Sequence, residues 1–340
     1  MFDTIKLGIP ITLSLREIQG VPWTRVSTKT VRRNGVEEQT NFCEYHDESY
    51  VGNPFIRYTY KEDDPTKAWF KVEVSLPKLL YGSNVYEITE NDIAFCWQFI
   101  KFYLSKLLKK HPNKIPPSYT WIVEKLHISK NFYVGQYKQN YLRCIEKSVL
   151  PQHKTSTYCE RGSDNLQTVE WIGSTRKVKI YDKLAEVLEN RGKHLLDDTK
   201  KAEGILRLEI ELSYDEIVLI SPSRTVSELL REDIATQKIN RELYRLGLSK
   251  NIKYTSIEEV INKIESENIK RIRKTSLIAF VVILITKGES GAKKYYAAST
   301  YKKNMSSLRK ILNIQKLIIT DIKLPPFSVE YGIFKKRNIA

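Results

Sequence analysis

The stretch STRKVKIYDKLAEVLEN, residues 174–190, changes its hydrophobic period at Tyr181. Before the tyrosine, valine and isoleucine alternate with lysines, which is the period-two pattern of a half-buried strand. After it, leucine, alanine and valine recur at helical spacing. The sequence therefore predicts a strand that gives way to a helix at Tyr181, with Lys179 before the tyrosine and Lys183 after it.

Three other segments show the same period-two alternation, namely KVEVSL (71–76), EKLHIS (124–129) and RLEIEL (207–212). Each has one apolar face and one polar face. A helix predicted over residues 92–110 carries an apolar stripe suited to cover the apolar faces. We therefore expect an α+β fold, in which an antiparallel sheet has helices on one face and a polar, open second face.

Each of the four strands places one reactive group on its polar face, and we name these groups Glu73, His127, Tyr181 and Glu209. If the strands form one sheet, the four groups converge on its open face. Two carboxylates and an imidazole suit Mg²⁺ or Mn²⁺. In this interpretation the metal polarises a phosphodiester oxygen and the tyrosine attacks phosphorus. The alternative is that these are ordinary polar residues on the outer face of a half-buried sheet.

Lysines surround the candidate tyrosine, which we interpret as contributors to the same chemistry. Lys177, Lys179 and Lys183 are expected to hold phosphates, to stabilise negative charge in the transition state, or to favour formation of the phenolate.

The distribution of charge separates the last fifth of the chain from the rest. The 340 residues carry a formal net charge of +16, and residues 270–340 hold 16 Lys and Arg against three acidic residues. Such a basic segment indicates a polyanionic partner, more often nucleic acid than membrane. Its alternative reading is a solvated surface.

The C-terminal part is predicted to be mainly helical, with helices over 225–246, 256–270 and 274–286. A turn with two glycines, two short helices and a hairpin over 314–334 complete the order. This order resembles a winged helix-turn-helix. We expect two domains, 1–215 and 225–340, with the boundary between Ser213 and Thr225. The residues expected to bind DNA are Lys293, Lys294, Lys302, Lys303, Arg309 and Lys310.

The four cysteines show no CxxC pairing and no zinc-ligand spacing. Reduced thiols and a start without signal-peptide features favour a cytoplasmic protein. The most apolar stretch, residues 277–285, is about half as long as a membrane helix and predicts a buried helix, so no membrane partner is expected.

The order and spacing of four blocks resemble the gene-II-type replication initiators of filamentous phages and their relatives on rolling-circle plasmids. The blocks are MFDTIKLGIP (1–10), KVEVSLPKLLYGSNVYE (71–87), EKLHISKNF (124–132), and TVEWIGSTRKVKIYDKLAEV (168–187) with RLEIEL (207–212). The likeness covers residues 1–215 and fades beyond them.

The resemblance implies a replication initiator related to the HUH endonucleases, that is, a single-strand DNA endonuclease and ligase. Such enzymes nick one strand at the origin, become joined to the 5′ phosphate through tyrosine, and free a 3′ hydroxyl that primes replication. Tyr181 matches the nucleophile, Glu73 and Glu209 match acidic positions, and His127 stands where many relatives carry aspartate. The implied partners are origin DNA, a host helicase and a host polymerase, and a homodimer is left open.

Three alternatives come from other classes. A tyrosine recombinase also forms a phosphotyrosine, but its Arg…His…Arg series before a C-terminal tyrosine is not seen in the sequence. A plasmid relaxase is closer in chemistry and stays open. A purely DNA-binding protein such as a repressor also stays open, and it predicts that Tyr181→Phe has no effect on DNA chemistry.

Overall fold

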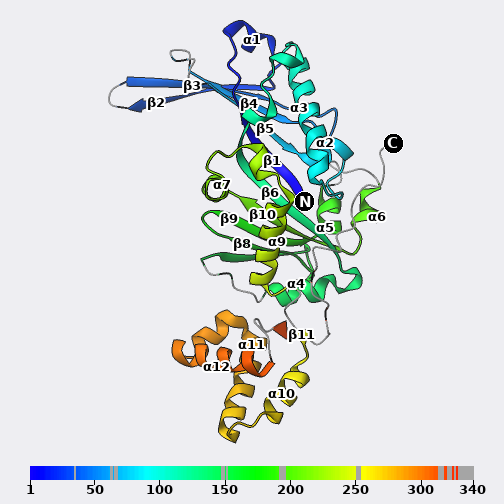
Figure 1. Ribbon diagram of the computed structural model, residues 1–340, viewed down its shortest axis with the longest axis vertical. Coiled ribbons are helices and arrows are strands. Elements are labelled where there is room, and N and C mark those ends of the chain that lie inside the picture. Colours follow the sequence, from blue (N-terminus) through cyan, green and yellow to red (C-terminus); the bar gives the residue numbers. More distant parts are fainter. Residues whose placement is uncertain are drawn as a thin grey trace.

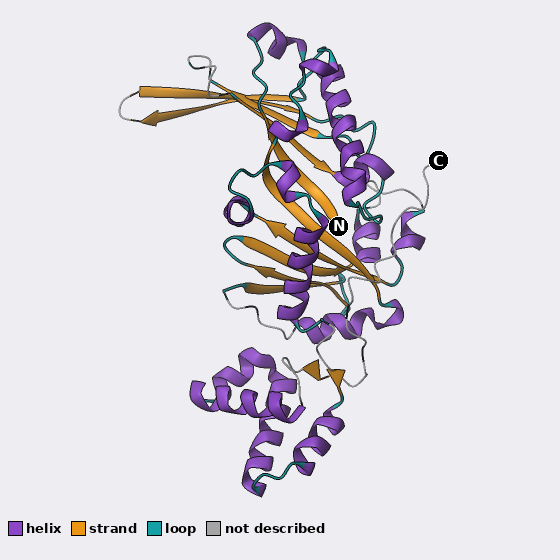
Figure 2. Cartoon of the chain, viewed as in Figure 1, coloured by secondary structure: helices purple, strands orange, loops and turns teal. Residues whose placement is uncertain are grey.

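A single ten-stranded antiparallel sheet forms the main body of the protein (Figures 1 and 2). The computed structural model describes residues 1–33, 36–61, 64, 68–146, 150, 152–190, 197–249, 254–312, 318–319, 324 and 327. The strand order is β2-β3-β4-β5-β1-β6-β10-β9-β8-β7. The strands are β1 (Phe2–Ile9), β2 (Arg25–Arg33), β3 (Val36–Tyr45), β4 (Phe55–Tyr60), β5 (Trp69–Ser75), β6 (Ile122–Tyr133), β7 (Lys154–Cys159), β8 (Leu166–Ile172), β9 (Arg176–Asp182) and β10 (Ile205–Leu212). The predicted α+β class with an antiparallel sheet is confirmed.

Helices cover one face of this sheet, where the alternating apolar side chains of the strands point. Ile5, Val72, Leu126 and Leu208 are among the strand residues that are fully buried there. The helices that contribute to the same core are α2 (Leu76–Tyr81), α3 (Ile93–Leu107), α4 (Lys138–Glu146), α7 (Tyr214–Ile220), α8 (Val226–Leu229) and α9 (Glu232–Leu246), and a short helix, α1 (Leu15–Gly20), adds Ile18. Period-two alternation thus sorts the sheet into a packed face and a polar face, as predicted.

The helix expected over 92–110 is α3, and a capping box formed by Thr89 and Asp92 precedes it. The Thr89 side chain and backbone both interact with the Asp92 carboxylate, which satisfies donors that the helix start would otherwise leave free. The inner face of α3, including Cys96, Ile100 and Leu104, is fully buried against the sheet.

The strand order decides which of the predicted site residues become neighbours. The four strands singled out in the sequence are β5, β6, β9 and β10, and the last three lie side by side. β1 lies between β5 and β6. Neighbouring strands are about 4.8 Å apart, so β5 is roughly 10 Å from β6 across the sheet.

The polar face is not open along its whole width. α5 (Lys183–Glu189) and α6 (Asp198–Ala202) lie over its β6–β10–β9 end, where Val85, Val187, Ala202 and Ile205 form a small apolar cluster. Because Ile205 shares the strand phase of Arg207 and Glu209, this cluster stands on the polar side of the sheet. One end of the polar face is therefore a buried environment.

The last described helices form a separate bundle at one end of the molecule (Figure 1). α10 (Ile257–Ser266), α11 (Arg271–Tyr295) and α12 (Ala298–Leu312) share their own apolar core. The predicted glycine turn is a kink inside α11, where Gly288 has φ 67° and ψ 179°. This left-handed φ is readily adopted by glycine.

The apolar stretch 277–285 lies in α11, with Leu277, Phe280 and Val281 fully buried, which confirms the predicted buried helix. Among the residues that the structure describes, no helix has the length and hydrophobicity needed to cross a membrane.

The predicted wing falls mostly outside the described residues. Of the expected hairpin over 314–334, only positions 318–319, 324 and 327 are described. Ile318–Ile319 (β12) pairs in parallel with Tyr254–Thr255 (β11). The winged helix-turn-helix therefore stays a prediction.

The change from one apolar core to the next lies later in the chain than the predicted boundary. Helix α9 and Leu248 belong to the core of the sheet, and the second core begins at Val260. Phe327 returns to the sheet body, where its ring stacks on Phe132 with centroids 4.4 Å apart. The helices over 225–246 thus pack with the sheet, not with the basic helices.

Candidate functional site

Tyr181 lies at the junction predicted from the sequence, since β9 ends at Asp182 and α5 begins at Lys183. The Asp182 side chain caps α5 by accepting a hydrogen bond from the Leu184 backbone N–H. In register, Tyr181 stands between Thr168 of β8 and Arg207 of β10, which places it on the polar face. Its side chain is only 6% exposed because α5 partly covers it.

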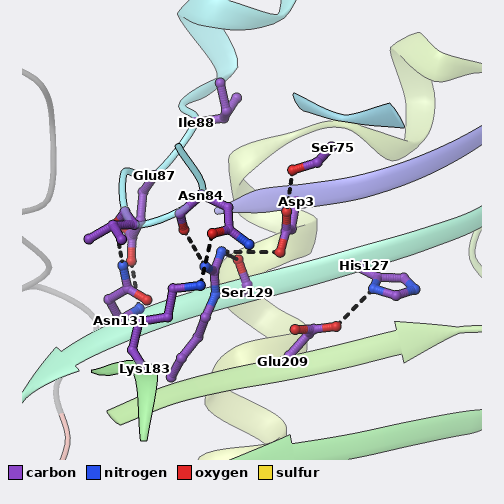
Figure 3. Close-up of polar contacts among 12 residues, drawn as sticks. Asp3, Ser75, Asn84, Glu87, Ile88, His127, Ser129, Asn131, Lys183 and Glu209 are labelled. Carbon is purple, nitrogen blue, oxygen red and sulfur yellow. Dashed lines mark hydrogen bonds and ion pairs between the residues drawn. The ribbon is translucent and has the colours of Figure 1, made fainter. Parts of the chain in front are cut away.

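The Tyr181 hydroxyl donates a hydrogen bond to Glu209, with 3.2 Å between Oη and Oε2. The other carboxylate oxygen of Glu209 is held by His127 Nδ1 at 2.8 Å (Figure 3) and by Lys179 Nζ at 3.0 Å. Three of the four predicted groups, together with Lys179, therefore meet around one carboxylate, and adjacent strands β6, β10 and β9 supply them.

Glu209 is a buried carboxylate that its neighbours keep ionised. Burial by itself raises its pKa. The hydrogen bond from His127 and the positive charges of Lys179, His127 and Arg207 outweigh burial and hold the pKa of Glu209 well below its usual range. At neutral pH the residue is an acceptor facing the phenol.

The phenol of Tyr181 is protonated at rest. Burial and the negative charge of Glu209 raise its pKa well above the ordinary value, while Arg207 acts in the opposite direction. Lys179 Nζ and Lys183 Nζ lie over the ring, 5.3 Å and 5.9 Å from its centroid. The expectation that the lysines favour phenolate formation is wrong for this arrangement, because burial and Glu209 dominate.

Lys183 is fully buried behind the tyrosine and does not face solvent. Its ammonium donates to Asn84 Oδ1 at 2.9 Å (Figure 3) and to Glu186 Oε2 at 2.5 Å. Burial and the charge of Arg207 lower the pKa of Lys183 to about 8, against the opposing effect of Glu186. The predicted catalytic lysine is thus held in a polar network beside Tyr181.

Arg207 is the centre of that network, and the sequence did not predict this role. Alternation alone placed it facing outward, yet it is fully buried. It pairs with Asp3 at 3.3 Å and donates to Ser129 Oγ at 2.7 Å and to the carbonyl oxygen of Asn84. Removing one partner from a buried ion pair lowers the stability of a protein by roughly 3–5 kcal/mol. Because Asp3, Ser129 and Arg207 belong to β1, β6 and β10, this network fixes the three strands relative to one another.

One signal in the sequence could have revealed the buried pair. Asp3 lies in the apolar phase of β1, with Ile5 and Leu7, where an unpaired carboxylate is costly. A register shift between Phe2 and Ile5 breaks the alternation. This shift lets Asp3 reach Arg207 on the polar face.

A cavity of about 390 Å³ opens beside Tyr181 and Glu209. It is mainly polar, and α5 and β8 form two of its walls. Its lining residues are Asp3, Thr4, Asn84, His127, Gln167, Thr168, Lys179, Tyr181, Asp182, Ala185, Glu186, Glu189 and Glu209. The cavity brings a phenolic hydroxyl, a carboxylate acceptor and a lysine to one space.

The predicted metal ligands do not all come together. Glu73 pairs in register with Lys6 of β1, and its carboxylate lies 3.8 Å from Lys6 Nζ, outside the cavity. The expectation that it converges with His127 and Glu209 is wrong, because β1 intervenes between β5 and β6. Within the described part of the chain, no three His, Cys, Asp or Glu residues are placed to hold a metal ion.

His127 has a second acidic neighbour on the same face. Its Nε2 lies 3.6 Å from Glu211 Oε2, while its Nδ1 contacts Glu209. The imidazole is mostly buried and lies between the buried carboxylate of Glu209 and the half-buried carboxylate of Glu211. It therefore holds Glu209 from the side that faces away from Tyr181.

The six residues predicted to bind DNA all lie on the surface of the C-terminal helices. Lys293 and Lys294 belong to the last turn of α11, and the others belong to α12. The buried residues of α12, such as Met305 and Leu308, face the opposite side. The basic side chains are therefore accessible to a polyanion.

Comparison of the chain with protein-family models, with curated proteins and with solved structures gave no match.

Proposed function

We propose that the protein is a rolling-circle replication initiator that nicks one strand of DNA and stays joined to it through Tyr181. The observation that carries the proposal is the hydrogen bond from the Tyr181 hydroxyl to Glu209 at the wall of a polar cavity. A hydroxyl nucleophile oriented by an adjacent base is the arrangement that covalent catalysis requires.

In the proposed step, Tyr181 Oη forms a bond to phosphorus and its proton passes to Glu209 Oε2. The bond from phosphorus to the 3′ oxygen breaks, and this oxygen takes up one proton from solvent to become a free 3′ hydroxyl, while Glu209 returns the proton of Tyr181 to solvent. The product is a 5′-phosphotyrosine, and the reverse reaction rejoins the strand. Because the phenol has a raised pKa and the carboxylate a lowered one, the proton moves as the new bond forms.

Other groups in the cavity have supporting roles in this proposal. Lys179 carries a positive charge at the cavity wall and is placed to stabilise charge on the phosphoryl oxygens. His127 holds Glu209 in position from its other side. Lys183 does not line the cavity, and its proposed role is to position Glu186, which does.

Mg²⁺ or Mn²⁺ remains the expected cofactor by resemblance, and when bound it would polarise the phosphodiester. Two of the predicted ligands, His127 and Glu209, lie together, whereas Glu73 does not join them. The donor set therefore fits the expected metal only in part, and the step above uses the chain's own residues.

The proposed division of labour assigns origin duplex binding to the basic helices. The six exposed basic residues of α11 and α12 would contact phosphates, which makes binding dependent on salt. Recruitment of a host helicase and polymerase, with the free 3′ hydroxyl as primer, completes the proposal.

The test is cleavage of a labelled single-stranded oligonucleotide that carries the cognate origin, in the presence of Mg²⁺, of Mn²⁺ or of EDTA. We expect a covalent adduct with the wild-type protein and none with Tyr181→Phe. Tyr86→Phe, at a tyrosine outside the cavity, is the matched control and should retain the adduct. Adduct formation that persists in Tyr181→Phe would contradict the choice of nucleophile, and absence of cleavage with the wild type would favour the DNA-binding alternative.

A further inference from the structure

The outer side of α3 carries three phenylalanines in a row that the sequence pattern did not predict. Phe95, Phe99 and Phe102 are 62%, 41% and 53% exposed. Their i, i+4 and i+7 spacing puts them on one face of the helix. Figure 1 shows α3 at the surface of the sheet body, away from the basic helices.

This face is large enough to be more than a chance exposure. Isolated apolar side chains are normal on protein surfaces. A contiguous strip of three phenylalanines presents on the order of 300 Å² of apolar area, which is the size of patch that is often functional. The opposite side of the same helix is fully buried, so α3 is apolar on two sides and not simply amphipathic.

Basic charge adjoins the strip at one end. Residues 93–110 contain four lysines and no acidic residue. Lys106 Nζ lies 4.4 Å from the centre of the Phe102 ring. Among the described residues, Lys101 and Lys109 form no ion pair, whereas Lys110 is paired with Glu17 at 2.7 Å. Lys106, on the same helix face as Phe102, and Lys109, just beyond the end of α3, therefore offer positive charge at this end of the strip.

The acidic residues at the other end of the strip are already engaged within the protein. The Asp92 carboxylate caps the helix start, and Glu90 Oε2 accepts a hydrogen bond from the Glu232 backbone N–H. The surface thus has an apolar half followed by a basic half. Since a nucleic-acid strand requires cations along its whole path, this polarity suits a peptide better than a polynucleotide.

We propose that this surface, formed by Phe95, Phe99, Phe102 and the lysines at 106 and 109, docks an acidic segment of a partner protein. The segment would place aromatic or aliphatic anchors on the phenylalanines and carboxylates beside the lysines. This docking surface lies on the helix-covered side of the sheet and does not involve the Tyr181 cavity.

The test measures binding of synthetic peptides by fluorescence anisotropy to the full-length protein. The probe is a peptide of about twelve residues, with phenylalanine and leucine anchors followed by four carboxylates. Two control peptides replace the carboxylates by lysines or the anchors by serines. We expect the acidic, anchored peptide to bind at least about tenfold more tightly than either control.

Variants of the protein test whether the peptide binds at the proposed surface of α3. Phe99→Ser and Lys106→Glu should each weaken binding about tenfold, and neither should change cleavage of DNA. Ile272→Ser, at an 85% exposed apolar residue of α11, is the matched control and should leave binding unchanged.

Three results would overturn the proposal. The first is equal or absent binding of acidic and basic peptides, and the second is unchanged binding in Phe99→Ser. The third is loss of self-association or of oligothymidine binding in Phe99→Ser, which would assign the face to a second copy or to DNA.

Discussion

The two halves of the polar sheet face carry the same kind of residues in different environments. On β5, Glu73 has a side chain that is 38% exposed, and its carboxylate lies 3.8 Å from Lys6 Nζ. On β10, Glu209 is 5% exposed and contacts Tyr181, His127 and Lys179. Both sit in the polar phase of alternating strands. The difference shows that strand phase alone does not create a site: a cover is needed, which here comes from α5 and the segment around Asn84.

Coverage by α5 and the segment around Asn84 makes the interactions between charged groups stronger than they are on the exposed part of the sheet. Exposed ion pairs are worth about 0–1 kcal/mol, because solvent and salt screen them. Behind α5 the same groups are desolvated, and burial raises the pKa of Tyr181. The pKa of Glu209 stays well below its usual range in spite of burial, because His127, Lys179 and Arg207 stabilise its charged form. Four variants test the roles assigned to these regions and to the basic helices, beginning with the one of largest expected effect.

Glu209→Gln should slow single-strand cleavage by about 10²–10⁴-fold, because the amide cannot take the proton of Tyr181. The rate is measured in single-turnover assays with labelled oligonucleotide. Circular dichroism and thermal unfolding of the variant serve as the control for folding. A rate within threefold of the wild type would remove Glu209 from the mechanism.

Replacing Lys302 and Lys303 together by glutamate should weaken binding of the origin duplex without changing single-strand cleavage. Each lost phosphate contact lowers the slope of log affinity against log salt by about 1. The affinity is measured by titration at several salt concentrations. Equal loss of binding and cleavage would contradict the division of labour between the two regions.

Lys183→Met should change how stability depends on pH. Burial lowers the pKa of Lys183 to about 8 from 10.5, so between these values the unfolded chain holds a proton that the folded chain has lost. The contribution of this residue therefore raises the free energy of unfolding as pH rises from 8 to 10.5, by roughly 3 kcal/mol. Denaturant unfolding of both proteins across this range should show the rise only in the wild type, and parallel profiles would refute it.

Glu73→Gln is the smallest change and the matched counterpart of Glu209→Gln. Because its pair with Lys6 is partly exposed, we expect cleavage within about threefold of the wild type and a loss of stability of at most about 1 kcal/mol. The same single-turnover assay measures it. A loss as large as that of Glu209→Gln would restore Glu73 as a metal ligand or catalytic group.

The sequence predicted the elements of the site better than their arrangement. Period-two phase correctly placed Tyr181, His127 and Glu209 on one face, because alternation depends only on local geometry. It failed for Glu73, since the position of β1 between β5 and β6 is set by long-range pairing. It also missed Arg207 and Lys183, whose burial depends on what covers the polar face.

In the C-terminal part, too, the sequence predicted the local elements but not which core each of them packs against. The helices and the glycine turn follow from local pattern, and they appear as α10, the kinked α11 and α12. We predicted that residues 225–246 belong to that part, but the apolar face of α9 packs in the core of the sheet. Helical spacing shows that a helix has an apolar face, but it does not show which element that face packs against.

The most direct test of the central claim is to identify the residue that becomes joined to DNA. The wild-type protein is incubated with origin oligonucleotide, digested, and the DNA-linked peptide is sequenced by mass spectrometry. The account predicts one modified peptide that carries a 5′-phosphate linkage on Tyr181. Modification of any other residue, or a linkage at the 3′ phosphate, would contradict it.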